Sequence, residues 1–156
     1  MPRSLTTLFL TLWCFIALSA KAEPQLEMTV YKSETCGCCI HWMDHLDQNG
    51  IQSEAIHPQD LGALKGALGV SPAMQSCHTG VVDDQYVFEG HVPAKHIKAF
   101  LAAPPEGAIG LSVPRMPVGS PGMEVGGRFD AYQIILLMKN GEHTVFADIK
   151  TPEAQY

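Results

Sequence analysis

Apolar and polar positions along the chain predict a mixed α/β fold. Short runs rich in β-branched and aromatic residues predict four strands, at 28–32, 51–56, 79–82 and 86–89. Apolar residues three and four positions apart predict three helices between and after these strands, at 39–49, 61–68 and 93–102. The resulting order, β-α-β-α-β-β-α, favours an α/β sandwich in which a βαβ unit precedes an antiparallel hairpin.

Residues at the element ends agree with these assignments. Asn49 and Gly50 form a stop signal after the first helix, and Asp60 can cap the second. Pro93 suits the first turn of the third helix, because its missing N–H has no partner there in any case. Two aspartates at 83–84 mark a hairpin turn between the last two of the four strands.

The C-terminal third of the chain has a different character. Two prolines at 104–105 end the third helix, and the glycine- and proline-rich stretch 110–127 predicts either an ordered functional loop or a flexible linker. Apolar runs at 132–138 and 144–147 then flank an Asn-Gly pair, which is typical of a hairpin with a type I′ turn. We expect the last six residues to be a frayed tail.

Residues 1–22 predict a secretory signal peptide. A basic residue near the start is followed by an apolar run at 5–20, and a small-x-small cleavage site ends at Ala22. The run is shorter than the ~20 residues that a bilayer-spanning helix needs, which favours cleavage over a membrane anchor. We therefore expect Cys14 to be removed with the signal, and residues 23–156 to form a single domain in an oxidising compartment.

Charge and composition argue against several functions. The 156-residue chain has a formal net charge of −6 at pH 7 without any block of like charges. Nucleic-acid binding requires clustered Lys and Arg, which are lacking here. After the signal no apolar run is long enough to span a membrane, so we expect no membrane association of the mature chain. The sequence also lacks a nucleophile elbow, a phosphate-binding loop and a dinucleotide-binding glycine motif.

Three cysteines occur in the run Cys36-Gly37-Cys38-Cys39, between the first predicted strand and the first predicted helix. The element order with cysteines at this junction resembles a thioredoxin-like fold. Unpaired N–H groups and the positive dipole end at a helix start stabilise a thiolate. Cys36 and Cys39 have the spacing of a redox dithiol, whereas Cys36 and Cys38 suit chelation. The third thiol favours a cluster of a soft metal such as Cu(I), and the alternative is a structural disulfide with one spare cysteine.

Further soft donors occur elsewhere in the chain. In a thioredoxin-like fold Cys77 would face the other cysteines, so we interpret it as a fourth sulfur ligand rather than a small buried residue. His78 is either a ligand or a residue at the entrance to a strand, and His91, which follows a glycine, can also bind metal. Met116 and Met123 bracket the glycine- and proline-rich loop, where thioethers could bind Cu(I) or simply fill gaps.

Two histidines, His41 and His45, lie four residues apart on the first predicted helix and therefore share a face. This spacing can chelate zinc or copper. It is also common on solvated helix faces, which is the interpretation we favour.

Together these segments resemble the CopG-type bacterial copper-resistance proteins. That family comprises exported, thioredoxin-like proteins long described as a domain of unknown function. The segments that carry the resemblance are Val30-Tyr31-Lys32-Ser33, Cys36-Gly37-Cys38-Cys39, Ser76-Cys77-His78-Thr79, Glu89-Gly90-His91-Val92-Pro93 and 116–124. The resemblance spans nearly the whole of residues 23–156, and the combination of motifs is more specific than any one of them.

The resemblance implies a periplasmic protein with a role in copper tolerance. It implies copper binding through the cysteine motif and a change of the bound copper between Cu(I) and Cu(II). Carried over by motif, the expected ligands are Cys36, Cys38, Cys39 and Cys77, with His91, Met116 and Met123 near the site. The expected partners are copper ions, other periplasmic copper-handling proteins and a redox partner.

Our leading hypothesis is a copper-binding protein that holds Cu(I) in a thiolate-bridged, multinuclear site. One alternative is a thiol–disulfide oxidoreductase that uses Cys36 and Cys39. Another is a copper metallochaperone that transfers the ion without redox chemistry. A structural zinc site fits less well, because such sites usually take two ligands from each of two separated knuckles.

Overall fold

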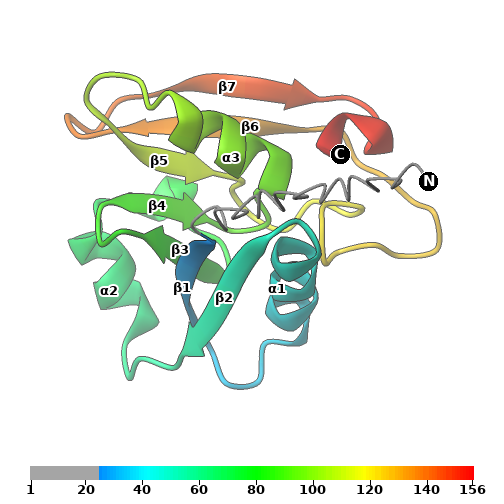
Figure 1. Ribbon diagram of the computed structural model, residues 1–156, viewed down its shortest axis with the longest axis horizontal. Coiled ribbons are helices and arrows are strands. Elements are labelled where there is room, and N and C mark those ends of the chain that lie inside the picture. Colours follow the sequence, from blue (N-terminus) through cyan, green and yellow to red (C-terminus); the bar gives the residue numbers. More distant parts are fainter. Residues whose placement is uncertain (1–24) are drawn as a thin grey trace, which may run out of the picture.

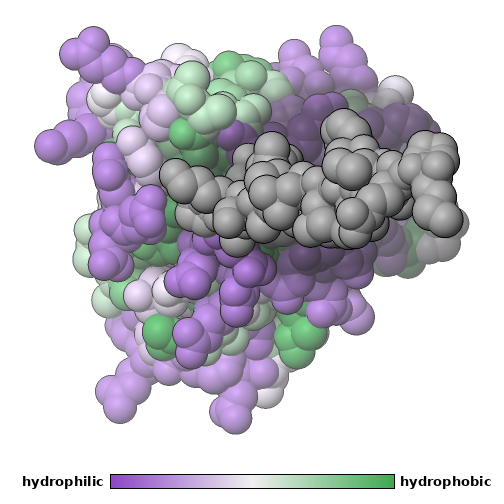
Figure 2. Space-filling view, viewed as in Figure 1, coloured by the Kyte–Doolittle hydropathy of each residue, from purple (hydrophilic) through white to green (hydrophobic). Residues whose placement is uncertain are grey.

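The computed structural model describes residues 25–156 of the chain. The expected signal peptide at 1–22 lies outside the described residues. Within residues 25–156, no helix has both the length and the apolar character needed to cross a membrane. Outside the grey atoms, the face seen in Figure 2 is mostly hydrophilic, as expected when most large apolar side chains are enclosed in the core.

A seven-stranded mixed sheet forms the centre of the fold, with strand order β2-β1-β3-β4-β5-β6-β7 (Figure 1). The strands are β1 (Leu26–Lys32), β2 (Ile51–Ile56), β3 (His78–Val82), β4 (Tyr86–Glu89), β5 (Ala108–Ser112), β6 (Tyr132–Met138) and β7 (His143–Ile149). The helices are α1 (Gly37–Gln48), α2 (Leu61–Ala67) and α3 (Ala94–Ala102), with short 3₁₀ turns η1 (Pro72–Met74) and η2 (Pro152–Gln155). The pairs β1–β2 and β4–β5 are parallel, and the other pairs are antiparallel.

Helices α1 and α2 cover opposite faces of the sheet. A side chain at Gly80 of β3 would collide with Met28 and the ring of Trp42, so α1 lies against that face. The neighbouring Thr79 points to the other face, where it accepts a hydrogen bond from Lys65 of α2. The largest core cluster includes Trp42 and Leu46 from α1 and Ile97 and Phe100 from α3.

The expected α/β class and the order of the first seven elements are confirmed. Each of these elements lies within two residues of its predicted range. Asp83 and Asp84 both have positive φ, 53° and 52°, as a tight primed turn between β3 and β4 requires. The more specific assignment to a thioredoxin-like fold stays a prediction.

Three expectations for the C-terminal part are wrong. Strand β5 was not predicted, and it joins the β6–β7 hairpin to the rest of the sheet. The turn before β7 is not of type I′, because Asn140 does not have the positive φ that this type needs and only Gly141 does, at 85°. The last residues do not fray, since Gln155 is buried and its side chain bonds the Tyr132 hydroxyl and the Gly119 carbonyl.

Candidate metal centre

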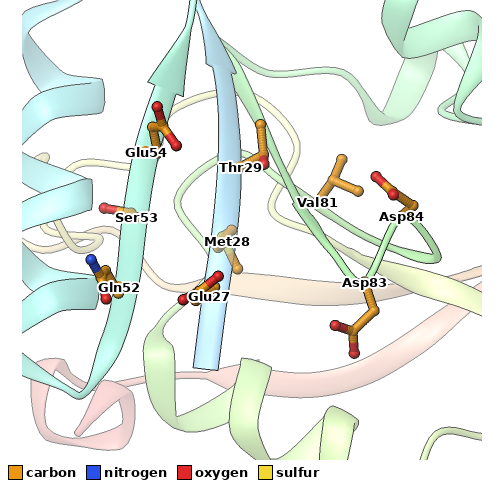
Figure 3. A pocket seen from close by; sticks show the side chains of 9 residues that line it. All are labelled: Glu27, Met28, Thr29, Gln52, Ser53, Glu54, Val81, Asp83 and Asp84. Atoms are coloured by element: carbon orange, nitrogen blue, oxygen red, sulfur yellow. The ribbon is translucent and has the colours of Figure 1, made fainter. Parts of the chain in front are cut away.

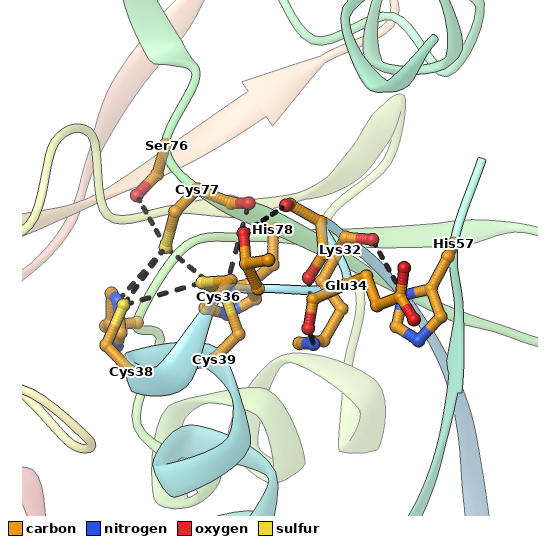
Figure 4. Close-up of a disulfide and its surroundings, with 12 residues drawn as sticks. Lys32, Glu34, Cys36, Cys38, Cys39, His57, Ser76, Cys77 and His78 are labelled. Carbon is orange, nitrogen blue, oxygen red and sulfur yellow. Dashed lines mark hydrogen bonds between the residues drawn. A yellow bond between two sulfur atoms is a disulfide. The ribbon is translucent and has the colours of Figure 1, made fainter. Parts of the chain in front are cut away.

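The cysteine run lies at the start of α1, as its sequence position predicts. Cys36 is the N-cap residue of this helix, and its side chain makes no capping hydrogen bond. Cys36 and Cys39 are joined by a disulfide (Figure 4). Among residues 25–156 the free thiols are Cys38 and Cys77. The expectation of four free thiols therefore does not hold for this form of the protein, and Cys36 and Cys39 can act as thiolates only after reduction.

Cys77 comes from a distant part of the chain and meets the cysteines of α1. It lies directly before β3, and its Sγ is 4.0 Å from the Sγ of Cys38, which is 39 positions earlier in the sequence. The Sγ of Cys38 is also 3.6 Å from that of Cys36. The four Sγ atoms of the cysteines all lie within 4.8 Å of one another. The predicted convergence of the two segments is thus present.

A buried polar network fixes the backbone that carries Cys77. One carboxylate oxygen of Glu89 accepts the backbone N–H of Ser76 at 2.6 Å, and the other accepts the Thr79 hydroxyl at 2.6 Å. Lys65 donates to the same carboxylate and, at 2.9 Å, to Thr79. Lys65 and Glu89 are almost completely buried, so their charges compensate each other away from water. This network holds both neighbours of the Cys77–His78 step in place.

Two imidazoles form a second donor group around the same thiol. The Nδ1 of His78 lies 3.2 Å from the Sγ of Cys77, and the Nε2 of His91 lies 3.3 Å from it. The Nδ1 of His91 is 2.8 Å from the Pro121 carbonyl, to which it can only donate, so the lone pair of the neutral ring is on Nε2 and faces the sulfur. Cys77, His78 and His91 therefore form a three-donor set.

The environment of His78 is unusual for a polar side chain. It is 0% exposed and stacks at a centroid distance of 4.2 Å on Trp42. Within residues 25–156, its Nε2 is one of two buried side-chain N or O atoms that have no hydrogen-bond partner. Burial, together with the neighbouring His91 and the positive charge of nearby Lys65, holds the pKa of His78 well below its ordinary value. The ring is therefore neutral at physiological pH, as a metal ligand must be.

Burial also shifts the pKa values of the other two donors of this set. It raises the pKa of the Cys77 thiol to about 12, and the nearby Cys38 adds to this effect. It lowers the pKa of His91, although the hydrogen bond to Pro121 and the negative charge of Glu124 partly oppose the change. At neutral pH the metal-free site thus holds a protonated Cys77 and a neutral His91, and a metal ion must displace the thiol proton.

The glycine- and proline-rich loop packs against both cysteine-bearing segments. A side chain at Gly122 would come within 2.8 Å of the Cys38 carbonyl, so the loop crosses the first turn of α1 there. The Ser76 hydroxyl donates to the carbonyl of Arg115. Met123 and Met116 each follow one of these contact residues in the sequence. Met123 is half-buried, whereas Met116 is 48% exposed, so Met116 has the weaker structural support as a ligand.

The histidine pair of α1 lies outside the two donor sets. His41 is exposed and lies 3.8 Å from Asp44. The Nε2 of His45 accepts the backbone N–H of Ala94 at the start of α3, which is a structural role. The interpretation of the pair as a solvated helix face thus holds for His41, while His45 connects two helices. His78 is the donor that sequence reasoning left undecided, and only its position beside Cys77 gave a signal.

A hollow of about 540 Å³ lies elsewhere on the sheet and does not suit a soft metal (Figure 3). Residues of β1, β2 and the β3–β4 turn line it, and its ionisable groups are carboxylates: Glu27, Glu54, Asp83 and Asp84. Glu27 is near the start of β1, whereas the cysteine run follows its end. Carboxylate oxygens prefer hard cations, so this hollow is no rival to the cysteine site for copper.

Fold and site together define an α/β protein whose cysteine sulfurs and imidazole nitrogens form a cluster able to hold a soft metal ion. Comparison with curated proteins gave no match. A family model described as a protein of unknown function, DUF411, matches residues 74–123, which include Cys77, His91 and both loop methionines.

Two solved structures, described as forms 1 and 2 of the copper resistance protein copG, resemble the chain closely. Both are 44% identical to it with a TM-score of 0.74. The match covers 80% of this chain and 97% of the form 1 chain, and 79% and 97% for form 2. The chain therefore belongs to the CopG family of copper resistance proteins, which confirms the resemblance found in the sequence motifs.

Proposed function

We propose that this protein binds copper as Cu(I) through the thiolates of Cys36, Cys38, Cys39 and Cys77. The observation that carries the proposal is the convergence of four Sγ atoms within 4.8 Å from two distant chain segments. Thiolates are soft ligands that select Cu(I) over hard cations. The similarity to proteins named for copper resistance supports copper as the ion and copper tolerance as the physiological role.

The spacing of the donors supports a site for more than one ion. A metal–thiolate bond is about 2.3 Å long for Zn²⁺, so two sulfurs that share an ion of similar size lie at most about 4.6 Å apart. The Cys36–Cys38 and Cys38–Cys77 sulfur separations, 3.6 and 4.0 Å, satisfy this condition. Cys77 also belongs to the set with His78 and His91, so its thiolate can bridge an ion bound by sulfurs and an ion bound by imidazoles. His91 and Met123 are the proposed additional ligands, with Met116 at the periphery.

Copper loading in this proposal requires reduction of the Cys36–Cys39 disulfide. In the oxidised form only Cys38 and Cys77 offer thiols, and the disulfide sulfurs are poor ligands. A reductant must supply two electrons to open the bond before all four thiolates can bind. We therefore propose a redox partner in addition to copper-handling partners, and we place the protein in the periplasm on the basis of the signal peptide expected at residues 1–22.

The test is a titration of the fully reduced mature chain with Cu(I) under anaerobic conditions, followed by metal analysis of the desalted protein. We expect more than one copper ion per chain, with copper–sulfur scattering in X-ray absorption. Cys38→Ser and Cys77→Ser should each lower the amount bound, while the control His41→Gln on the exposed face of α1 should not. A stoichiometry of one or less, or normal loading of Cys38→Ser, contradicts a multinuclear site.

A change of the bound copper between Cu(I) and Cu(II) is a finer part of the same proposal. The mixed sulfur and nitrogen donors around Cys77 support it, because imidazole suits Cu(II) as well as Cu(I). The X-ray absorption edge of loaded protein should move reversibly when an oxidant and then a reductant are added. Copper that leaves the protein on oxidation, or transfer to an acceptor without any edge change, would instead favour a metallochaperone.

The disulfide favours a second candidate function, thiol–disulfide oxidoreductase activity of Cys36 and Cys39. They have the C-x-x-C spacing at a helix start, where thiolates are stabilised. Cys39 is 0% exposed, so only the half-buried Cys36 could meet a substrate disulfide. Insulin reduction by metal-free protein tests this function. Activity that survives Cys38→Ser and Cys77→Ser would establish the oxidoreductase, whereas no turnover above the reductant alone would exclude it.

A further inference from the structure

The loop between β1 and α1 encloses an ammonium group that has no carboxylate partner. Lys32 is the last residue of β1 and is 2% exposed. Its Nζ donates to the Ser33 carbonyl at 2.9 Å and to the Glu34 carbonyl at 3.5 Å. Among residues 25–156, no Asp or Glu oxygen lies within 4.0 Å of this nitrogen. Lys65, the other buried lysine, is in contrast paired with Glu89.

A buried charge without a counter-charge is costly, because it loses its hydration and gains only partial compensation from carbonyl dipoles. Such a group in a folded protein calls for an explanation. The carbonyls do not require it, since that of Ser33 also accepts the Cys36 N–H at 3.1 Å and Glu34 is an exposed residue. The charge is therefore not explained by the contacts of the oxidised form.

Lys32 is connected on two sides to the cysteine site. The Ser33 carbonyl binds both the ammonium of Lys32 and the N–H of Cys36, so the charge shares an acceptor with the N-cap residue of α1. Across the β1–β3 pair, Lys32 is the register partner of His78, whose Nδ1 contacts the Cys77 sulfur. Figure 4 shows Lys32 within the group of side chains that surrounds the disulfide.

We propose that Lys32 supplies the buried counter-charge for the reduced and copper-loaded forms of the cysteine site. The disulfide is neutral, so in the oxidised form the ammonium has nothing to balance. On reduction by a dithiol the Cys36–Cys39 bond breaks, two electrons pass to its sulfurs, the dithiol becomes a disulfide, and its two protons go to solvent. The site gains two negative charges beside a cation that is already in place. Four thiolates with fewer than four Cu(I) ions also keep a net negative charge.

The copper-loaded half of this inference rests on the proposed function, while the reduction half can be measured on metal-free protein. The experiment equilibrates metal-free protein with dithiothreitol buffers of defined ratio and counts alkylated Cys36 and Cys39 by mass spectrometry. We expect Lys32→Met to shift the equilibrium about tenfold toward the disulfide, which corresponds to about 30 mV for a two-electron couple. Lys32→Arg keeps the charge and should stay within about twofold of the original protein.

Lys98→Met is the matched control, since Lys98 also donates to a backbone carbonyl, that of Asn49, but is exposed on α3. It should leave the equilibrium unchanged. An unchanged ratio in Lys32→Met, or an equal shift in Lys32→Arg, overturns the proposal.

Thermal unfolding gives a second, independent measurement. Because the charge has no counter-charge in the oxidised form, the disulfide form of Lys32→Met should be at least as stable as the original protein, and only its reduced form should be less stable. A disulfide form that unfolds or melts several degrees lower contradicts the proposal. Copper stoichiometry of the original chain is measured separately, so either idea can fail while the other stands.

Discussion

The Nε2 atom of His91 lies 3.3 Å from the Sγ atom of Cys77, with its lone pair directed at the sulfur. The direction is fixed from the other side of the ring, where Nδ1 donates to the carbonyl of Pro121 in the glycine- and proline-rich loop. One loop residue thus determines which nitrogen of His91 can bind a metal. The relationship connects three segments of the chain at one thiol and leads directly to the first prediction.

Replacing His91 by Gln should weaken copper binding without abolishing the sulfur site. The variant loses an imidazole at the shared Cys77 thiolate but leaves the four sulfurs in place, so we expect at least about a tenfold loss of affinity for one ion. Competition with a Cu(I) chelator measures the affinity, and X-ray absorption should show fewer nitrogen scatterers. His96→Gln on α3 serves as the control, because His96 packs against Phe146 away from the donors. Identical chelator curves for the His91 variant and the original protein would exclude His91 as a ligand.

Gly122→Ala should displace the loop from α1. Gly122 has φ of +85°, and a Cβ atom there would lie 2.6 Å from the Trp42 nitrogen, which is backbone and cannot move aside. Gly141 is a matched control, since it has the same φ of +85° but a Cβ atom there would meet nothing within 4 Å. Gly141→Ala should cost about 1–2 kcal/mol for its backbone conformation alone, and Gly122→Ala about 1–3 kcal/mol more for the collision. Urea unfolding of both variants measures the difference, and equal costs would mean that the loop does not press on α1.

The sequence was most informative where local patterns decide the structure. The strands and helices up to α3 followed from periodicity and from residues such as Asp60, whose carboxylate does cap α2. Strand β5 escaped prediction because Gly110 interrupts its apolar run. That glycine is required by packing, since a side chain there would collide with the backbone of Val87. No local pattern announces such a long-range requirement.

The same distinction applies to the metal centre. The spacing of Cys36, Cys38 and Cys39 revealed the site, because all three lie in one turn of the chain. The motif resemblance added Cys77. The pairing of Cys36 with Cys39 rather than Cys38 depends on the geometry of the helix start, and the spacing alone left it open. The support of the site by Glu89 and Lys65 was equally inaccessible, since these residues are 24 positions apart and meet only in the folded sheet.

The Lys65–Glu89 pair should be much more important as a pair than as separate charges. Lys65→Met leaves the Glu89 carboxylate buried and without its cation, which costs about 3–5 kcal/mol. The double variant Lys65→Met with Glu89→Leu removes both charges and should recover a large part of that loss. Denaturant unfolding of the disulfide form measures both. Equal stability of the single and double variants would show that the charges are not coupled, and that the Ser76 amide depends on the pair less than its 2.6 Å hydrogen bond to Glu89 indicates.

Acid should destabilise the metal-free protein through its buried histidines. Burial holds the pKa values of His78 and His91 below the ordinary value of 6.5, so the unfolded chain binds these protons more readily than the folded one. The stability that they contribute is fully present above about pH 6.5 and is lost as the pH falls below it, by at most about 1.4 kcal/mol per pH unit for each histidine. Urea unfolding of the disulfide form between pH 7.5 and 5 measures the slope. His78→Phe keeps a ring against Trp42 but cannot take up a proton, so its slope should be smaller. An unchanged slope in this variant would mean that His78 does not titrate differently in the folded and unfolded chains, and the neutral imidazole assigned to it beside Cys77 would have to be abandoned.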